Sequence, residues 1–240
     1  MSHTTNQLIH IVWCLLYLFT IYYIQQVKFP ILQSNYYTQS NQWQPGITRF
    51  LTYWNLIIQA VYFFICVLND CFGTNAVSPK KPSFIRKLKD CMHAILSFPI
   101  AMFVGITFWS LMFVDRELIL PKALDPYLPW WLNHLMHSMI VVSIVIETIL
   151  TPRKYPKRLQ GLLGIITFVH IYLFWTLIIY YKCNVWVYPI MEVLSWPSRI
   201  LFFIALISFS ISLYFVGEAM DNFFWGNKYT QHQKSNAKIK

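Results

Sequence analysis

The chain has 240 residues, of which 57% are hydrophobic, 18% aromatic and only 12% charged. Soluble domains carry about 25% charged residues, so this balance indicates a membrane protein and argues against a soluble one. The formal net charge of +10 does not indicate nucleic-acid binding, because the basic residues lie in short segments between apolar runs. The five cysteines lack paired spacing, so neither a disulfide framework nor a zinc ribbon is predicted.

Apolar runs recur along the whole chain, each close to the length that crosses a bilayer core of about 30 Å as a helix. They predict an all-α membrane protein, a bundle of six transmembrane helices at about residues 8–24, 50–72, 91–114, 130–150, 159–181 and 199–217. The first run lacks the basic start and the small-residue cleavage site of a signal peptide, so we expect a retained helix. One transmembrane domain, 1–226, would then precede a basic tail, 227–240.

Charge gives the predicted orientation. If the amino terminus is cytoplasmic, the inner loops and the tail hold thirteen of the 19 Lys and Arg residues, and the outer loops hold six. Cytoplasmic loops carry an excess of basic residues, so both termini are predicted to be cytoplasmic. The sequence does not distinguish the plasma membrane from the endoplasmic reticulum.

The second span carries polar residues on one side. Thr52, Asn55, Gln59 and Asp70 fall within about 60° of one another at 100° per residue. Lipid-facing positions would not hold Asn and Gln, so we expect this face to look into the bundle. Interhelical hydrogen bonds used only for packing explain Asn55 and Gln59 as well as function does.

The fourth span opens with the densest polar stretch of the chain, which contains Asn133, His134, His137 and Ser138. Ionisable groups at membrane depth are costly and are usually functional. Both the second and the fourth span start from the predicted outer side, so Thr52 and His137 belong to the outer third of the bilayer. A hydroxyl and an imidazole at matched depth are the minimum for nucleophilic acyl transfer.

Short blocks in a fixed order also carry a family resemblance. They are Phe50-Leu-Thr-Tyr-Trp-Asn55, Leu68-Asn-Asp70, Phe98-Pro99, Asp115-Arg-Glu-Leu118, Trp131-Leu-Asn-His-Leu-Met-His-Ser138, Tyr155-Pro156 and Trp186-Val-Tyr-Pro189. With them the chain resembles the androgen-induced gene family from about residue 8 to 226. The Asn-His-x-x-His block is the most specific part.

The resemblance implies a multi-pass threonine hydrolase that cleaves fatty acid esters of hydroxy fatty acids. It assigns the nucleophile to Thr52 and the histidine to His137. This sequence departs from the family pattern in two places. Ser138 stands where the family has threonine, and the segment 44–48 replaces a more basic run. The second departure leaves substrate preference open.

Three further residues are supporting polar candidates. Asn55 and Asn133 could polarise a carbonyl on grounds of proximity alone, and His134, about 60° round the helix from His137, should affect packing or orientation. A metal site at the two histidines is disfavoured, because Asp70 and His170 are predicted at other depths. We therefore predict no metal and no cofactor.

A lipid ester substrate within the lipid bilayer is the expected partner, with no nucleic acid; protein partners are not indicated. The competing reading is a non-catalytic membrane adaptor, or a lipid or ion pathway that uses the polar face as a conduit. A closed apolar pocket at the outer end would favour the hydrolase. A path running through to Asp70 would favour the conduit.

Overall fold

The computed structural model describes residues 3–27 and 45–238, with side chains as far as residue 232. Most of the segment between the first two predicted spans, residues 28–44, lies outside these ranges. The described part is all-helical and contains six helices long and apolar enough to cross a membrane. They are α1 (His3–Gln26), α3 (Leu51–Phe72), α4 with α5 (Phe84–Met92, Phe98–Val114), α6 with α7 (Trp130–His134, Ile140–Leu150), α8 (Arg158–Cys183) and α10 (Trp196–Lys238). The predicted six-helix fold is confirmed.

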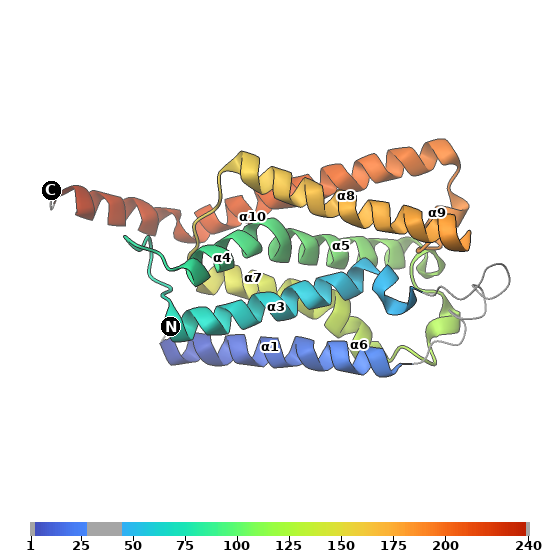
Figure 1. Cartoon of the computed structure of the whole chain (residues 1–240), viewed down its shortest axis with the longest axis horizontal. Coiled ribbons are helices and arrows are strands. Elements are labelled where there is room, and N and C mark those ends of the chain that lie inside the picture. Colours follow the sequence, from blue (N-terminus) through green and yellow to red (C-terminus); the bar gives the residue numbers. More distant parts are fainter. Residues whose placement is uncertain (1–2, 28–44, 239–240) are drawn as a thin grey trace.

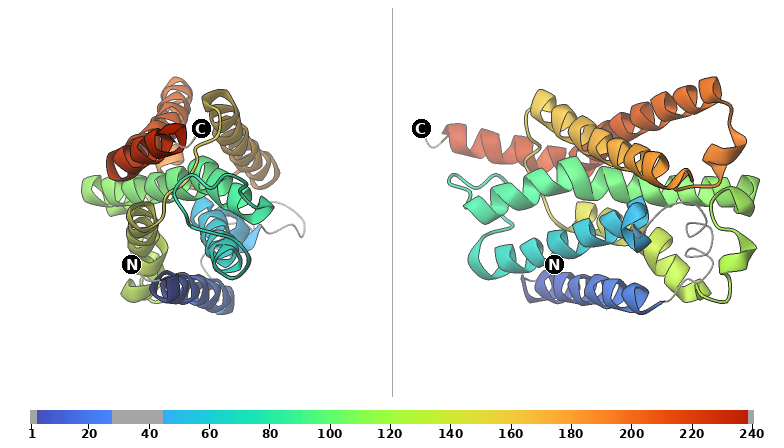
Figure 2. Two further views of the ribbon diagram at one scale, coloured as in Figure 1. Left: turned by 90° about the vertical axis from the view of Figure 1, so that its left-hand side faces the viewer. Right: turned by 45° about the vertical axis from the view of Figure 1, so that its right-hand side comes forward.

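The helices lie side by side, with α1 at one edge and α8 and α10 at the other (Figure 1). Figure 2 shows α3 and α5 between these edges in both further views. The most apolar stretch of α3 is 56% buried, against 22% for α8 and for α10. α3 is therefore a core helix that has its polar face turned inward, whereas α8 and α10 keep most of their apolar surface for lipid.

Two of the six spans are interrupted by a π-helical turn, His93–Ser97 before α5 and Leu135–Met139 between α6 and α7. In the first case Pro99 is the second residue after the turn, and a proline has no N–H and clashes with the carbonyl four residues earlier. The wider turn accommodates that clash and is the local form of the kink that a proline produces in a helix. The second turn contains no proline; single π-turns inside helices are frequent at functional sites.

Two element boundaries differ from the sequence prediction. The third span begins at Phe84 rather than near residue 91, because Ser83 caps it by accepting a hydrogen bond from the Arg86 N–H at 3.2 Å. The last helix continues to Lys238 instead of ending near residue 217. Its extension is held by tertiary contacts, since Trp225 Nε1 donates to the Thr148 carbonyl at 3.1 Å and the Tyr229 hydroxyl donates to the Arg153 carbonyl at 2.8 Å.

The first and last helices start and finish at the same end of the bundle, which we call the terminus end (Figure 1). An even number of spans places both ends of the chain on one side of a membrane. That this side is the cytoplasm stays a prediction, which rests on the charge asymmetry.

Cysteine labelling tests this orientation. In a background with the accessible Cys71, Cys91 and Cys183 changed to serine, we expect Lys157→Cys, exposed at the terminus end, to react with an impermeant maleimide only after permeabilisation. Asp125→Cys, in the exposed loop before α6, should react in intact cells. Labelling of position 157 from outside intact cells would show the reverse orientation.

Candidate functional site

Thr52 and His137 meet at the end of the bundle opposite the terminus end. Thr52 is the second residue of α3, and His137 lies in the π-turn between α6 and α7. The Thr52 Oγ1 and the His137 Nε2 are 3.2 Å apart, although 85 residues separate the two positions. His137 is only 5% exposed. The structure thus brings the two residues that the sequence placed at similar depth into hydrogen-bond distance.

The His137 ring is held in one orientation by its neighbours. Its Nδ1 lies 3.0 Å from the Asn133 carbonyl oxygen, and a carbonyl only accepts, so Nδ1 carries the proton. The lone pair of Nε2 is then free to accept the Thr52 hydroxyl proton. The ring also stacks on Phe108, with centroids 3.6 Å apart and planes 13° apart. The orienting group is therefore a backbone carbonyl, which a search for acidic side chains could not find.

The side chains of the three supporting candidates, Asn55, Asn133 and His134, make no hydrogen bond to Thr52 or to the His137 ring. Asn55 is fully buried and accepts from Gln59 Nε2 at 3.0 Å, and Asn133 is 1% exposed. Neither side chain borders the two pockets at Thr52. His134 contacts Ser138 (Nδ1 to Oγ, 2.9 Å) and stacks on Trp109, so it belongs to a separate aromatic group.

Tyr188 lies in one of the family blocks, but the sequence did not predict it as a site residue; it contacts the start of α3 beside Thr52. Its hydroxyl accepts from the Leu51 N–H at 3.1 Å and lies 3.1 Å from the Tyr172 hydroxyl. Tyr172 in turn donates to the Arg49 carbonyl at 2.9 Å, which leaves Tyr188 as the donor between the two hydroxyls. Burial raises the pKa of Tyr188, so it stays protonated at neutral pH.

Two apolar pockets open from Thr52. The first, here the α8–α10 pocket, encloses about 1050 Å³ including the part open to the surroundings, and residues of α5, α8 and α10 form most of its wall. The second, here the loop pocket, encloses about 680 Å³ on the same measure and is bordered by α1, α3 and the loop 119–128. Concave, mostly apolar pockets with a few polar groups are typical of ligand sites.

A conduit along the polar face is not supported. Neither pocket includes Asn55, Gln59 or Asp70. Gln59 is fully buried and donates to the Ser97 carbonyl at 2.9 Å, so it packs α3 against the third span. Among the described residues the polar face is divided into a site at Thr52, a packed middle and a separate cluster at the terminus end.

That cluster is built around His10. Its Nδ1 lies 2.5 Å from Asp70 Oδ2 and its Nε2 2.8 Å from Glu147 Oε2, and all three side chains are buried. Both carboxylates accept, so both ring nitrogens donate and the ring is an imidazolium. Lys89 Nζ is 3.7 Å from Glu147 Oε1. Two cations thus balance two carboxylates, as buried charges require.

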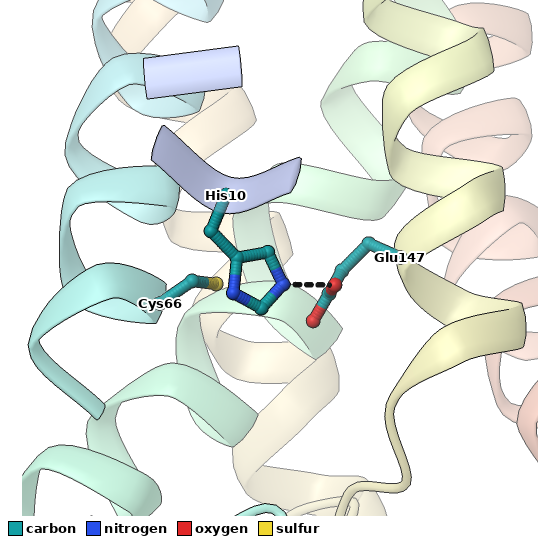
Figure 3. Close-up of side chains that lie close together, drawn as sticks. All are labelled: His10, Cys66 and Glu147. Carbon is teal, nitrogen blue, oxygen red and sulfur yellow. Dashed lines mark hydrogen bonds and ion pairs between the residues drawn. The ribbon is translucent and has the colours of Figure 1, made fainter. Parts of the chain in front are cut away.

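Within the cluster, His10, Cys66 and Glu147 point toward one another (Figure 3) and offer ligand atoms within 4.8 Å of one another. The spacing is suitable for a metal ion, but both nitrogens of His10 are already bonded to carboxylates. Glu147 also accepts from the Tyr62 hydroxyl at 3.0 Å and from Thr151. The arrangement is that of a complete ion-pair network that joins α1, α3, α4 and α7.

Comparison with known proteins agrees with the resemblance seen in the sequence. The family model described as FAR-17a/AIG1-like protein matches residues 5–222. The human androgen-induced gene 1 protein is 36% identical over 83% of this chain and 87% of its own length. The androgen-dependent TFPI-regulating protein of Rattus norvegicus is 36% identical over 98% of this chain and 100% of its own length. No solved structure matches. The chain belongs to the FAR-17a/AIG1-like family of membrane proteins.

Proposed function

We propose that this protein hydrolyses lipid esters within the membrane, with fatty acid esters of hydroxy fatty acids as substrates, Thr52 as nucleophile and His137 as base. The observation that carries the proposal is the 3.2 Å approach of Thr52 Oγ1 to an unprotonated His137 Nε2. Apolar pockets meet at this hydroxyl, so an ester already dissolved in the bilayer can reach it.

The reaction proceeds in two transfers. Thr52 Oγ1 attacks the ester carbonyl while His137 Nε2 takes its proton, and the imidazolium then protonates the alkoxide as the carbonyl–oxygen bond breaks. The acyl group stays on Thr52 as an ester, and the alcohol leaves. Water attacks this ester with His137 again as base, and Thr52 recovers its proton as the carboxylic acid leaves.

Negative charge on the carbonyl oxygen needs donors beside Thr52. The Tyr188 hydroxyl does not fill this role, because its one proton is already donated to the Tyr172 hydroxyl. Thr52 stands in the first turn of α3, where backbone N–H groups carry the positive end of the helix dipole. These groups, rather than Asn55 or Asn133, are the donors that the geometry favours.

The alternative from another class is a membrane adaptor without catalysis. The rat relative's name refers to regulating TFPI, a role that does not itself require an enzyme. A packing role accounts for Asn55 and Gln59, but it gives no reason for an oriented, acceptor imidazole at a threonine hydroxyl that opens on two pockets. The hydrolase is therefore the better supported function.

Covalent labelling tests the proposal directly. A lipophilic fluorophosphonate reacts only with activated hydroxyl groups, so we expect it to label the wild-type protein on the peptide that contains Thr52. Thr52→Ala should abolish the label, and Thr48→Ala should keep it, because the Thr48 hydroxyl is bonded to the Pro45 carbonyl at 2.5 Å. An adduct on another residue, or none on a folded wild-type protein, would contradict the assignment.

A further inference from the structure

The two pockets are not equivalent with respect to the catalytic pair. Thr52 borders both of them, whereas His137 borders the loop pocket and is absent from the wall of the α8–α10 pocket. Phe108, on which the His137 ring stacks, also borders both pockets. The base therefore faces one side of the nucleophile only.

The chemistry assigns a side to each half of an ester. The imidazolium of His137 must reach the leaving oxygen at about 3 Å to protonate it. The leaving oxygen, and the alcohol part attached to it, must therefore lie on the His137 side of Thr52. The acyl chain continues from the carbonyl carbon in the other direction and stays attached to Thr52 after the first transfer.

Resting on the proposed function, we infer that the α8–α10 pocket binds the hydrocarbon chain of the acyl part and that the loop pocket binds the alcohol part. The site is then a two-armed one, bent at Thr52, for esters in which both parts are long. The assignment rests on the side of Thr52 at which His137 lies. The pockets themselves do not distinguish the two halves of the ester, because both are apolar.

The walls agree with this assignment. The α8–α10 pocket includes Thr176 and Ser210, but both hydroxyls are bonded to the backbone of their own helices, at 2.7 and 2.9 Å. Apart from Thr107, Tyr172 and Tyr188, the rest of its wall away from Thr52 is formed by apolar side chains, which suits a hydrocarbon chain. The outward-facing Leu201 and Ile204 on α10 are exposed, so this side of the bundle borders lipid, from which a chain can enter.

The loop pocket borders a different segment. Its wall includes Leu120, Leu124 and Leu128 from the loop before α6, none of which lines the α8–α10 pocket. Cleavage gives the alcohol part a new hydroxyl, and in a hydroxy fatty acid this part also carries a carboxylate. The more polar product is therefore released on the loop side of Thr52, and the fatty acid on the α8–α10 side, which borders lipid.

The experiment fills each pocket in turn and varies each half of the substrate. Ile207→Trp narrows the α8–α10 pocket and Leu124→Trp narrows the loop pocket, and neither residue borders both. Purified protein in lipid nanodiscs is given hexadecanoyl and butanoyl esters of one long alcohol, and hexadecanoyl esters of a long and a short alcohol.

For Ile207→Trp we expect kcat/KM to fall at least about tenfold for the hexadecanoyl ester and to stay within about twofold for the butanoyl ester. For Leu124→Trp we expect kcat/KM to fall at least about tenfold for the ester of the long alcohol and to stay within about twofold for the ester of the short alcohol. This loss should not depend on the length of the acyl chain. The exchanged pattern, or equal losses for every ester in variants that melt like wild type, would overturn the assignment.

Two further comparisons keep the result interpretable. If a tryptophan variant does not fold, Ile207→Ala and Leu124→Ala replace it, because removing wall contacts weakens only the long chain that lies against them. Failure of the proposed function is seen separately, since the wild-type protein would then cleave none of the esters, or Thr52→Val would cleave them equally well.

Discussion

We expect Thr52→Val to lower kcat/KM for a long-chain branched ester by about 10⁴-fold, because valine keeps the shape of threonine but removes the attacking oxygen. Thr52→Ser keeps the hydroxyl and loses only a methyl group, so it should retain measurable activity. Purified variants in nanodiscs, assayed by release of the free fatty acid, give the comparison.

The second member of the pair should behave as part of the same unit. His137→Ala should cost about 10²–10⁴-fold as the general base and acid is lost. Thr52→Val combined with His137→Ala should be no worse than Thr52→Val alone, because both changes remove the same transfer. Tyr188→Phe should cost much less than either change, because the Leu51 N–H keeps the Tyr172 hydroxyl as an acceptor at 2.9 Å.

His134→Ala is the matched control. His134 is the same residue type on the same span, but it contacts Ser138 and Trp109 rather than Thr52. It should keep most of the activity of the folded protein. Hydrolysis by correctly inserted Thr52→Val at nearly the wild-type rate would refute the catalytic assignment and favour the adaptor.

The sequence predicted the spans well because a bilayer imposes a length and an apolar composition that can be read locally. It predicted the inward polar face of α3 for the same reason. The ends were harder: the last helix runs past residue 217 because Trp225 and Tyr229 find partners near Thr148 and Arg153, contacts that local composition does not contain.

The site was predictable only in part. The family resemblance named Thr52 and His137, and helix counting gave them similar depth. The π-turn that carries His137 and the backbone carbonyl that orients it have no sequence pattern of their own. Asn55 and Asn133 were chosen by proximity in sequence, but each lies about one helical turn from its catalytic neighbour and neither lines a pocket.

His10 shows the same limit at the other end of the molecule. Asp70 and Glu147 were visible as charges near span ends, but their shared partner is 60 residues from one and 137 from the other. Only the packing of α1 against α3 and α7 makes one network from them. A buried charge in a predicted span is thus a sign that a partner exists, without indicating which residue it is.

Glu147→Gln should be the most destabilising single change in this network, at about 3–5 kcal/mol. Glu147 faces His10 at 2.8 Å and Lys89 at 3.7 Å, and it accepts from Tyr62 at 3.0 Å. Glutamine removes one of the two carboxylates that balance the two cations and directs an NH₂ group at existing donors. Thermal unfolding in detergent should show a clear loss of melting temperature.

The matched change is Glu218→Gln. Glu218 pairs with Arg158 at 3.2 Å, but Arg158 is 70% exposed, so water replaces much of what the pair contributes and the cost should stay below about 1 kcal/mol. The cluster lies at the end opposite Thr52, so folded Glu147→Gln should hydrolyse esters at the wild-type rate per molecule. Lost hydrolysis at unchanged melting temperature would instead mean that the cluster takes part in function, since a purely structural network acts only through the folded fraction.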